Sequence, residues 1–112
     1  QSRVVVLHIP DLFFALRVAD ALKHLGFVTR DVEGSADFNG ASLFVVQLTG
    51  ARETWLSWIA AAKTAGVPVL AFGRHTEAET LRAARQAGAS KVVPNSELVT
   101  DLPNLVSALV TP

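Results

Sequence analysis

The most constraining feature of the sequence is the apolar run at residues 43–46, which ends in the neutral amide of Gln47. Its β-branched and aromatic residues are typical of a strand that is buried on both faces of a sheet. Similar runs precede it at residues 4–7 and follow it at residues 67–72, with helical patterns between them. This alternation predicts a parallel sheet with helices on both faces, in which functional groups lie at the carboxyl ends of the central strands.

The composition limits the chain to a few classes of protein. Its 112 residues suffice for one domain over residues 1–112, and half of them are hydrophobic. Ten basic and ten acidic residues cancel, which argues against nucleic acid as a main partner. The absence of cysteine excludes disulfides, thiolate metal sites and a cysteine nucleophile. No apolar run is long enough to span a membrane, and the chain starts almost directly with a strand, so we expect no signal peptide and a cytoplasmic location.

The predicted order of elements is a strand followed by a helix, repeated along the chain. We expect strands at residues 4–7, 27–32, 43–47, 67–72 and 91–93, and helices at residues 12–25, 52–65, 77–87 and from near Asp101 onward. Residues 33–41 are too few for a full helix and should form a loop with at most one helical turn, at residues 35–38. The second helix is therefore shortened or absent, and the second strand is an edge strand.

Helical spacing of apolar residues predicts which faces are buried. The first helix should start at the N-cap Asp11 and turn one stripe toward the sheet, consisting of Leu12, Leu16, Ala19 and Leu22, with Phe13 and Phe14 widening it. The second helix presents Trp55, Trp58, Ile59 and Ala62. Both tryptophans can pack on the sheet, or one of them can lie at a partner surface.

Two further helices follow from local signals. Thr76 and Glu79 have the spacing of a capping box, and Leu81 is the one large apolar residue of the helix after them. The last helix should carry Pro103 in its first turn. Its apolar face consists of Leu102, Leu105, Val106 and Leu109.

Two passages resemble the receiver domain of bacterial two-component response regulators. Residues 86–94, QAGASKVVP, look like the receiver passage "xAGAxxYLxK" into strand five, and residues 67–70, VPVL, look like the "IPVI" of strand four. The resemblance implies a flavodoxin-like α/β fold: a three-layer sandwich whose five-stranded parallel sheet has the order 2-1-3-4-5.

The resemblance also implies where phosphotransfer residues would stand. Receivers carry an acid pair after strand one, a phosphoacceptor Asp after strand three, a Ser or Thr after strand four and a Lys after strand five. In this chain these positions are occupied by His8 and Ile9, Gln47, Gly73 and Asn95. All five depart from the receiver pattern, and Asp11 is a lone acid at a shifted position.

An amide cannot replace the carboxylate nucleophile of aspartyl phosphate formation, and His8 with Ile9 does not supply the oxygen ligands that the metal needs. The resemblance therefore implies a degenerate receiver that is not phosphorylated, is not an enzyme and uses no cofactor.

A small-ligand sensor is the alternative hypothesis. Five polar residues should lie near the carboxyl edge of the sheet, where they can form a pocket for an anionic or amide-bearing ligand: His8, Gln47, Arg74, His75 and Asn95. Loop ends of any α/β fold are polar, however, so the pattern alone does not establish a site. A metal site at His8 and His75 would lack a third ligand, and we expect no metal.

The leading hypothesis is a signalling module that acts through protein–protein contact. The expected surface is the one that many receivers use, here the helix at residues 77–87, the strand at residues 91–93 and the last helix. Its candidate residues are Leu81, Arg82, Arg85, Lys91, Leu102 and Leu105. Eight aromatic side chains and a net charge of zero favour self-association as a homodimer, with the face of Trp55 and Trp58 as the second choice of interface.

Overall fold

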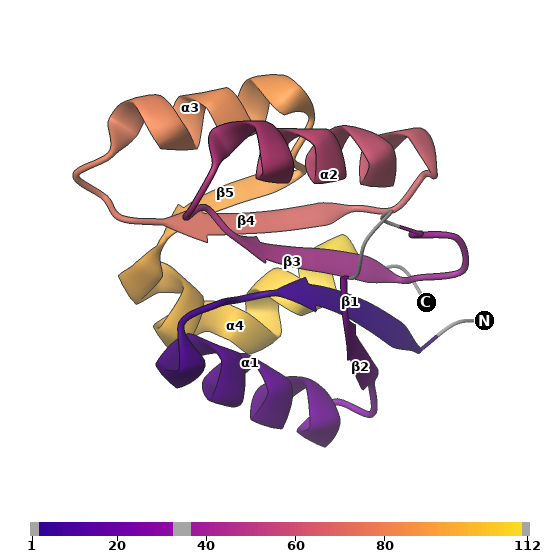
Figure 1. Ribbon diagram of the computed structural model, residues 1–112. Helices are drawn as coiled ribbons and strands as arrows, with labels where there is room; N and C mark the ends of the chain where they lie inside the picture. Colours follow the sequence, from indigo (N-terminus) through magenta and orange to yellow (C-terminus); the bar gives the residue numbers. More distant parts are fainter. Residues whose placement is uncertain (1–2, 33–36, 111–112) are drawn as a thin grey trace.

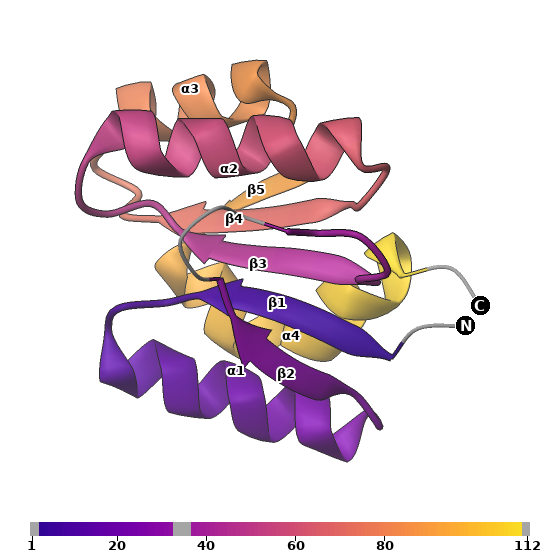
Figure 2. The same ribbon diagram turned by 45° about the vertical axis from the view of Figure 1, so that its right-hand side comes forward.

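Five parallel strands form one sheet in the order β2-β1-β3-β4-β5 in the computed structural model, which describes residues 3–32 and 37–110 (Figure 1). The strands are β1 (Val4–His8), β2 (Val28–Asp31), β3 (Leu43–Gln47), β4 (Val69–Gly73) and β5 (Lys91–Pro94). The helices are α1 (Leu12–His24), α2 (Arg52–Thr64), α3 (Ala78–Ala87) and α4 (Asn95–Leu109). Helices α1 and α4 cover one face of the sheet, and α2 and α3 cover the other (Figures 1 and 2). The predicted three-layer fold and strand order are confirmed.

The sheet separates two apolar cores, because successive side chains of a strand point to opposite faces. From β3, Leu43 and Val45 enter the core under α1 and α4, whereas Phe44 and Val46 enter the core under α2 and α3. All four of these side chains have no exposed surface. The strand at the centre of the sheet is thus buried on both faces, as its unbroken apolar run predicts.

The edge strand β2 is thinly covered, as expected. Between it and β3, the described residues hold a tight turn in which the amide of Ala41 donates to the carbonyl of Phe38 at 3.1 Å. The Phe38 side chain is buried against the ring of Phe44, with 4.7 Å between centroids. The predicted helical turn at residues 35–38 begins outside the described residues.

Helix α1 shows a different face to the sheet from the one that the sequence predicts. Leu12 and Leu16 are 69% and 62% exposed, while Val18 and Leu22 are buried. Phe14 packs its ring against Phe72 on β4, with 5.5 Å between centroids. The helix has two apolar stripes, and the prediction that Leu12, Leu16 and Ala19 face the sheet is wrong.

The start of α1 explains this choice of stripe. The carboxylate of Asp11 accepts a hydrogen bond from the amide of Phe13 at 2.9 Å, as the predicted N-cap should. The amide of Asp11 in turn donates to the Oε1 atom of Gln47 on β3 at 3.0 Å. These two bonds fix the rotation of the first turn relative to the sheet, and Phe14 is the side chain that then points inward.

The start of α2 at Arg52 agrees with the prediction, but the starts of α3 and α4 do not. The N-cap of α3 is Glu77 and makes no side-chain capping bond, so the capping box of Thr76 and Glu79 is wrong. A turn closed by the bond from the Glu77 amide to the Arg74 carbonyl, at 3.0 Å, keeps Thr76 outside the helix. Glu79 lies 3.5 Å from Arg82 instead.

Helix α4 begins at Asn95, directly after β5, and not near Asp101. The backbone leaves helical geometry at Asp101, where φ is −127° and ψ is 18°. Pro103 follows, and a proline inside a helix removes one hydrogen bond and commonly causes a kink. The predicted helix is therefore the second half of a longer, kinked one.

None of the helices in the described part of the chain has the length and apolarity that a bilayer crossing requires.

A matched pair of substitutions tests the orientation of α1. Leu22→Ala removes a fully buried side chain and should lower the free energy of unfolding by about 3 kcal/mol, whereas the exposed Leu16→Ala should change it by less than about 0.5 kcal/mol. Urea unfolding at low micromolar protein concentration measures both. Equal losses for the two variants would mean that α1 is rotated from the position described.

Candidate functional site

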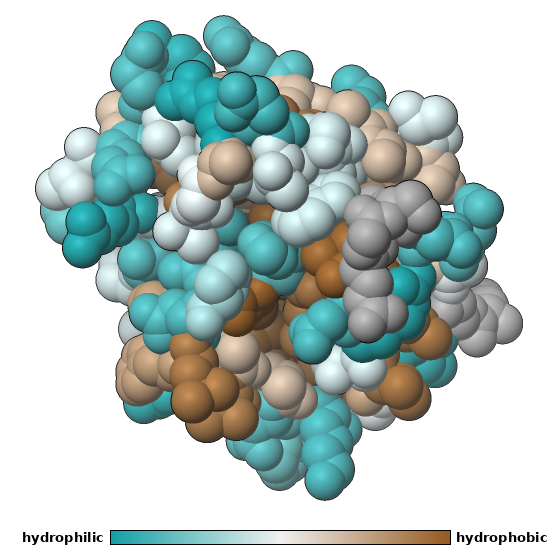
Figure 3. Space-filling model, in the orientation of Figure 1, coloured by the Kyte–Doolittle hydropathy of each residue, from teal (hydrophilic) through white to brown (hydrophobic). Residues whose placement is uncertain are grey.

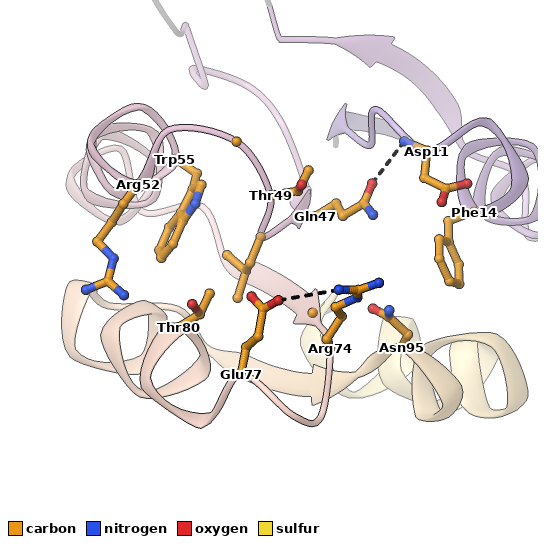
Figure 4. Close-up of a pocket in the computed structure, with 13 residues that line it drawn as sticks. Asp11, Phe14, Gln47, Thr49, Arg52, Trp55, Arg74, Glu77, Thr80 and Asn95 are labelled. Atoms are coloured by element: carbon orange, nitrogen blue, oxygen red, sulfur yellow. Dashed lines mark hydrogen bonds and ion pairs between the residues drawn. The ribbon is translucent and has the colours of Figure 1, made fainter.

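A pocket of roughly 530 Å³ opens where β3, β4 and β5 end (Figure 4). The loops after parallel strands and the first turns of the following helices meet at this edge, so the ends of β3 and β4 and the starts of all four helices contribute to the pocket or flank it. Its lining residues are Asp11, Phe14, Gln47, Leu48, Thr49, Gly50, Arg52, Trp55, Gly73, Arg74, Glu77, Thr80 and Asn95.

Gln47 is the last residue of β3 and is half-buried at the floor of this region. Its Oε1 atom accepts the amide hydrogen of Asp11, which joins the loop after β1 to the central strand. Figure 4 shows the Gln47 side chain beside Asp11, to which a dashed line joins it, with Asn95 below them. A neutral amide thus occupies the end of the central strand, and one of its two polar atoms already serves a structural hydrogen bond.

The structure brings together only part of the predicted polar pocket. Gln47, Arg74 and Asn95 line it, together with Gly73. His75 is exposed and is not among the lining residues. His8 lies on the α2 side of the sheet, because strand alternation sends its side chain to the same face as Val6.

His8 belongs to a neighbouring groove. Its imidazole meets the ring of Trp58 edge to face, with centroids 4.5 Å apart, and the groove of roughly 360 Å³ beside it is also lined by Pro10, Thr54 and Trp55. Burial lowers the pKa of His8 below 6.5, and the carboxylate of Asp31 opposes this shift in part.

Ile9, the second position where receivers carry an acid, is a buried core residue with 9% of its surface exposed. Among residues 3–32 and 37–110 there is no group of three or more His, Cys, Asp or Glu side chains that could hold a metal ion.

The charges around the pocket are balanced. Arg74 lies 3.9 Å from Glu77, with both side chains largely in solvent, so this pair adds little stability. Arg52 and Asp11 provide the other two charges, and the Asp11 carboxylate is engaged in capping α1. The pocket can therefore offer a guanidinium to a ligand from either of two sides.

Three helices begin at this edge without a side-chain capping bond: the N-caps of α2, α3 and α4 are Ala51, Glu77 and Pro94. Free amide groups at helix N-termini favour negatively charged groups. At the start of α4, the Oδ1 atom of Asn95 is buried and has no hydrogen-bond partner among the described residues. These polar groups leave the pocket suited to a small polar molecule.

Sequence reasoning missed several lining residues, namely Asp11, Phe14, Thr49, Arg52, Trp55, Glu77 and Thr80. The residues at the starts of α2 and α3 could have been predicted, because the helix after each parallel strand starts at the same edge of the sheet. The place of Phe14 in the pocket could not have been predicted from the sequence, because it depends on the rotation of α1 about its axis.

The residues expected at an interaction surface divide into two groups. Leu81, Leu102 and Leu105 are at most 9% exposed, and Trp55 is 2% exposed, because α2, α3 and α4 use them to close the two cores. Arg82, Arg85 and Lys91 are exposed, and Trp58 is partly buried. Helix α3, strand β5 and helix α4 thus present a polar surface of mixed charge, in which Arg82 lies 3.5 Å from Glu79, and not the apolar one that the leucines predicted.

No protein-family model matches the sequence, and neither does any curated protein. Solved structures do match it. A CheY-like response regulator from Mesorhizobium loti aligns with a TM-score of 0.72 and 20% identity, over 96% of this chain and 98% of that one. The orphan response regulator HP1043 of H. pylori aligns with a TM-score of 0.67 and 18% identity, over 94% and 91% of the two chains.

A response regulator protein from Burkholderia pseudomallei, solved with a phosphorylated aspartic acid, a calcium ion and citrate, aligns with a TM-score of 0.71 and 18% identity, over 99% of this chain and 68% of that one. The chain has the receiver fold. The likeness at these identities establishes the fold, and it confirms at that level the resemblance seen in residues 67–70 and 86–94. In this chain, Gln47, Gly73 and Asn95 line the pocket at the carboxyl edge of that fold.

The partly buried His8 gives the stability of this chain a predicted pH dependence. Because the folded state lowers the pKa of His8, the unfolded chain binds the proton more readily, and the stabilisation present above pH 6.5 is lost as the pH falls through the folded pKa. His8→Gln should therefore reduce the loss of unfolding free energy between pH 7 and pH 5. Asp31→Asn, which removes the opposing charge, should enlarge that loss. Chemical unfolding at both pH values measures the difference, and an unchanged slope in both variants would contradict the burial of His8.

Proposed function

We propose that this chain is a receiver-like regulatory domain of two-component signalling that acts by protein–protein contact and without phosphoryl transfer. The observation that carries the proposal is the amide of Gln47 at the end of β3, bonded through Oε1 to the Asp11 amide. The receiver fold supports the regulatory class. The proposal makes the domain a cytoplasmic binding protein and not an enzyme.

The chemistry of the site supports the absence of phosphotransfer. Aspartyl phosphate forms when a carboxylate oxygen attacks the phosphorus of a donor, and a carboxamide is too weak a nucleophile for that attack. The reaction in receivers also requires a divalent cation with several oxygen ligands. Here Ile9 is apolar and buried, and His8 is turned to Trp58 on the other side of β1.

The proposed partner is a protein. Arg82, Arg85 and Lys91 are exposed on α3 and β5 and outnumber the one acid of these two elements, Glu79, which lies 3.5 Å from Arg82. This basic surface suits an acidic segment of a partner. The pocket and this surface share α3, since Glu77 and Thr80 line the pocket at the start of the helix. A change at the carboxyl edge would therefore reach the basic surface through one element.

A small-ligand sensor is the second candidate, and the pocket is the observation that favours it. Its volume, the uncapped starts of α2 and α4, the unpaired Asn95 Oδ1 and the two arginines suit a small anionic or amide-bearing molecule. The two candidates are compatible if the ligand acts on the surface of α3.

The chain should be inert to phosphodonors. Incubation with acetyl phosphate and magnesium should leave its intact mass unchanged, because residue 47 offers no carboxylate. A receiver that is known to be phosphorylated serves as the positive control in the same buffer. A stoichiometric phosphoryl adduct would refute the proposal.

Restoring the acceptor alone should not restore the reaction. Gln47→Asp should fold with a loss of about 1 kcal/mol, since the shorter side chain gives up the hydrogen bond to Asp11, and it should stay unphosphorylated because His8 and Ile9 supply no metal ligands. Gln47→Ala is the matched control for the lost bond. Phosphorylation of Gln47→Asp in the presence of magnesium would show that the metal ligands lie elsewhere.

The sensor candidate has its own test. Native mass spectrometry of the purified protein should show a bound molecule of low mass if the pocket is a sensor site, and Arg74→Gln should weaken its retention, with the exposed Arg85→Gln as control. A ligand-free spectrum for the wild-type protein, both as purified and after incubation with a panel of small carboxylates, would leave protein contact as the sole candidate.

A further inference from the structure

The large apolar side chains that the structure leaves exposed lie on one face of the molecule. In residues 3–32 and 37–110, the exposed large hydrophobics are Leu12, Phe13 and Leu16 of α1 and Val28 of β2, with 55–69% of their surfaces in solvent. Figure 3 shows hydrophobic surface over the N-terminal half of α1, at the lower left. Contiguous exposed apolar surface of this kind marks an interaction site more often than chance placement.

Helical geometry makes this face a stripe. Leu12, Leu16 and Ala19 recur with the i, i+4, i+7 spacing of one side of a helix, and Lys23 continues the row by one turn. The opposite stripe of α1 is the one that packs on the sheet. Helix α1 is thus apolar on two sides, and the rotation set by the Asp11–Gln47 bond leaves one of them in solvent.

A groove lies beside the C-terminal half of this stripe. It has a volume of roughly 460 Å³ and lies between α1 and the start of β2, lined by Leu16, Ala19, Lys23, Phe27 and Val28 among others. The small Ala19 leaves room in it, while Leu12, at the other end of the stripe, protrudes with 69% of its surface exposed. The same face thus carries a protruding apolar side chain at one end and an apolar recess at the other.

We propose that this face binds a second copy of the chain, with the two α1 helices packed antiparallel about a two-fold axis. In that arrangement Leu12 of each copy lies opposite the groove of the other, so the protrusion and the recess are both used twice, as an isologous interface requires. The inference deepens the proposed function, which rests on protein–protein contact, by naming one partner and one surface.

The charges on the flank of the stripe favour this occupant and orientation. Arg17 and Asp20 lie next to the apolar row on the same side of α1, about one turn apart. An antiparallel two-fold pair keeps this flank of both helices on the same side and places each Arg17 opposite Asp20 of the other copy. The guanidinium of Arg17 rests over the Phe13 ring at 4.9 Å, which holds it at the border of the face. The net charge of zero adds no repulsion between copies.

Strand β2 borders the same face but does not suit edge-to-edge pairing. Arg30 and Asp31 are exposed charges on this short edge strand, and charged residues of this kind discourage the addition of another strand. The contact is therefore assigned to side chains of α1 and not to an extension of the sheet. One helix face and a shallow groove give a small interface, so dissociation should fall in the micromolar range.

Charge reversal tests both the partner and the orientation. Sedimentation velocity from low to several hundred micromolar protein should show a monomer–dimer equilibrium for the wild type. Arg17→Asp and Asp20→Arg should each weaken the dimer about tenfold, because each brings like charges together across the axis. An equimolar mixture of the two variants should recover the wild-type dissociation constant, since the charges are again opposite in the mixed dimer.

Leu16→Glu tests the apolar contribution and should leave a monomer, with circular dichroism confirming that this exposed substitution keeps the fold. Arg85→Asp on α3 is the control and should leave the dimer intact. The inference is overturned by a wild type that stays monomeric over the whole range, by a dimer that the α1 variants do not weaken, or by one that Arg85→Asp disrupts. Each of these results is independent of the mass measurement with phosphodonors, so the failure of the dimer and the failure of the proposed function can be told apart.

Discussion

Burial of the central strand on both faces is the constraint on which the rest of the structure depends. Leu43 and Val45 fill one core and Phe44 and Val46 fill the other, so β3 has no side chain in contact with solvent until Gln47. Helices must cover both faces to bury these residues. Polar chemistry is then confined to the edge where the strands end, and the residue that closes β3 determines what that edge can do.

The hydrogen bond between Gln47 and Asp11 links this edge of the sheet to the start of α1. It fixes the first turn of the helix, turns Phe14 onto Phe72 and leaves Leu12 and Leu16 in solvent. A single amide therefore closes the central strand at the pocket and is bonded to the first residues of the helix that carries the exposed apolar face.

Much of the fold could be predicted from the sequence, because the buried strands are continuous apolar runs separated by helical patterns. The face of α1 could not be predicted in the same way. Leu12, Leu16 and Ala19 form a stripe as regular as the one through Phe14, Val18 and Leu22, and only the tertiary contact at Gln47 selects between them. The start of α4 could not be predicted either. Residues 95–100 are mostly polar and show no clear apolar stripe, and the helix begins at Asn95, directly after the end of β5.

The candidate site was predictable in its framework and not in its detail. Strand ends place Gln47, Gly73, Arg74 and Asn95 at one pocket, as the topology requires. His8 does end β1 at this edge, as predicted, but strand alternation directs its side chain to Trp58 on the α2 side and not to the lining of the pocket. The orientation of His75 depends on a loop, for which the sequence contains no periodic signal.

The carboxyl edge of the sheet is built around the amide of Gln47, and we propose that it binds no phosphoryl group together with a metal ion. Nuclear magnetic resonance with beryllofluoride and magnesium, which together imitate a phosphorylated aspartate in its metal site, tests it most directly. The side-chain amide signals of Gln47 and the backbone amide of Asp11 should stay unchanged throughout the titration. Saturable, magnesium-dependent shifts of these signals would contradict the account.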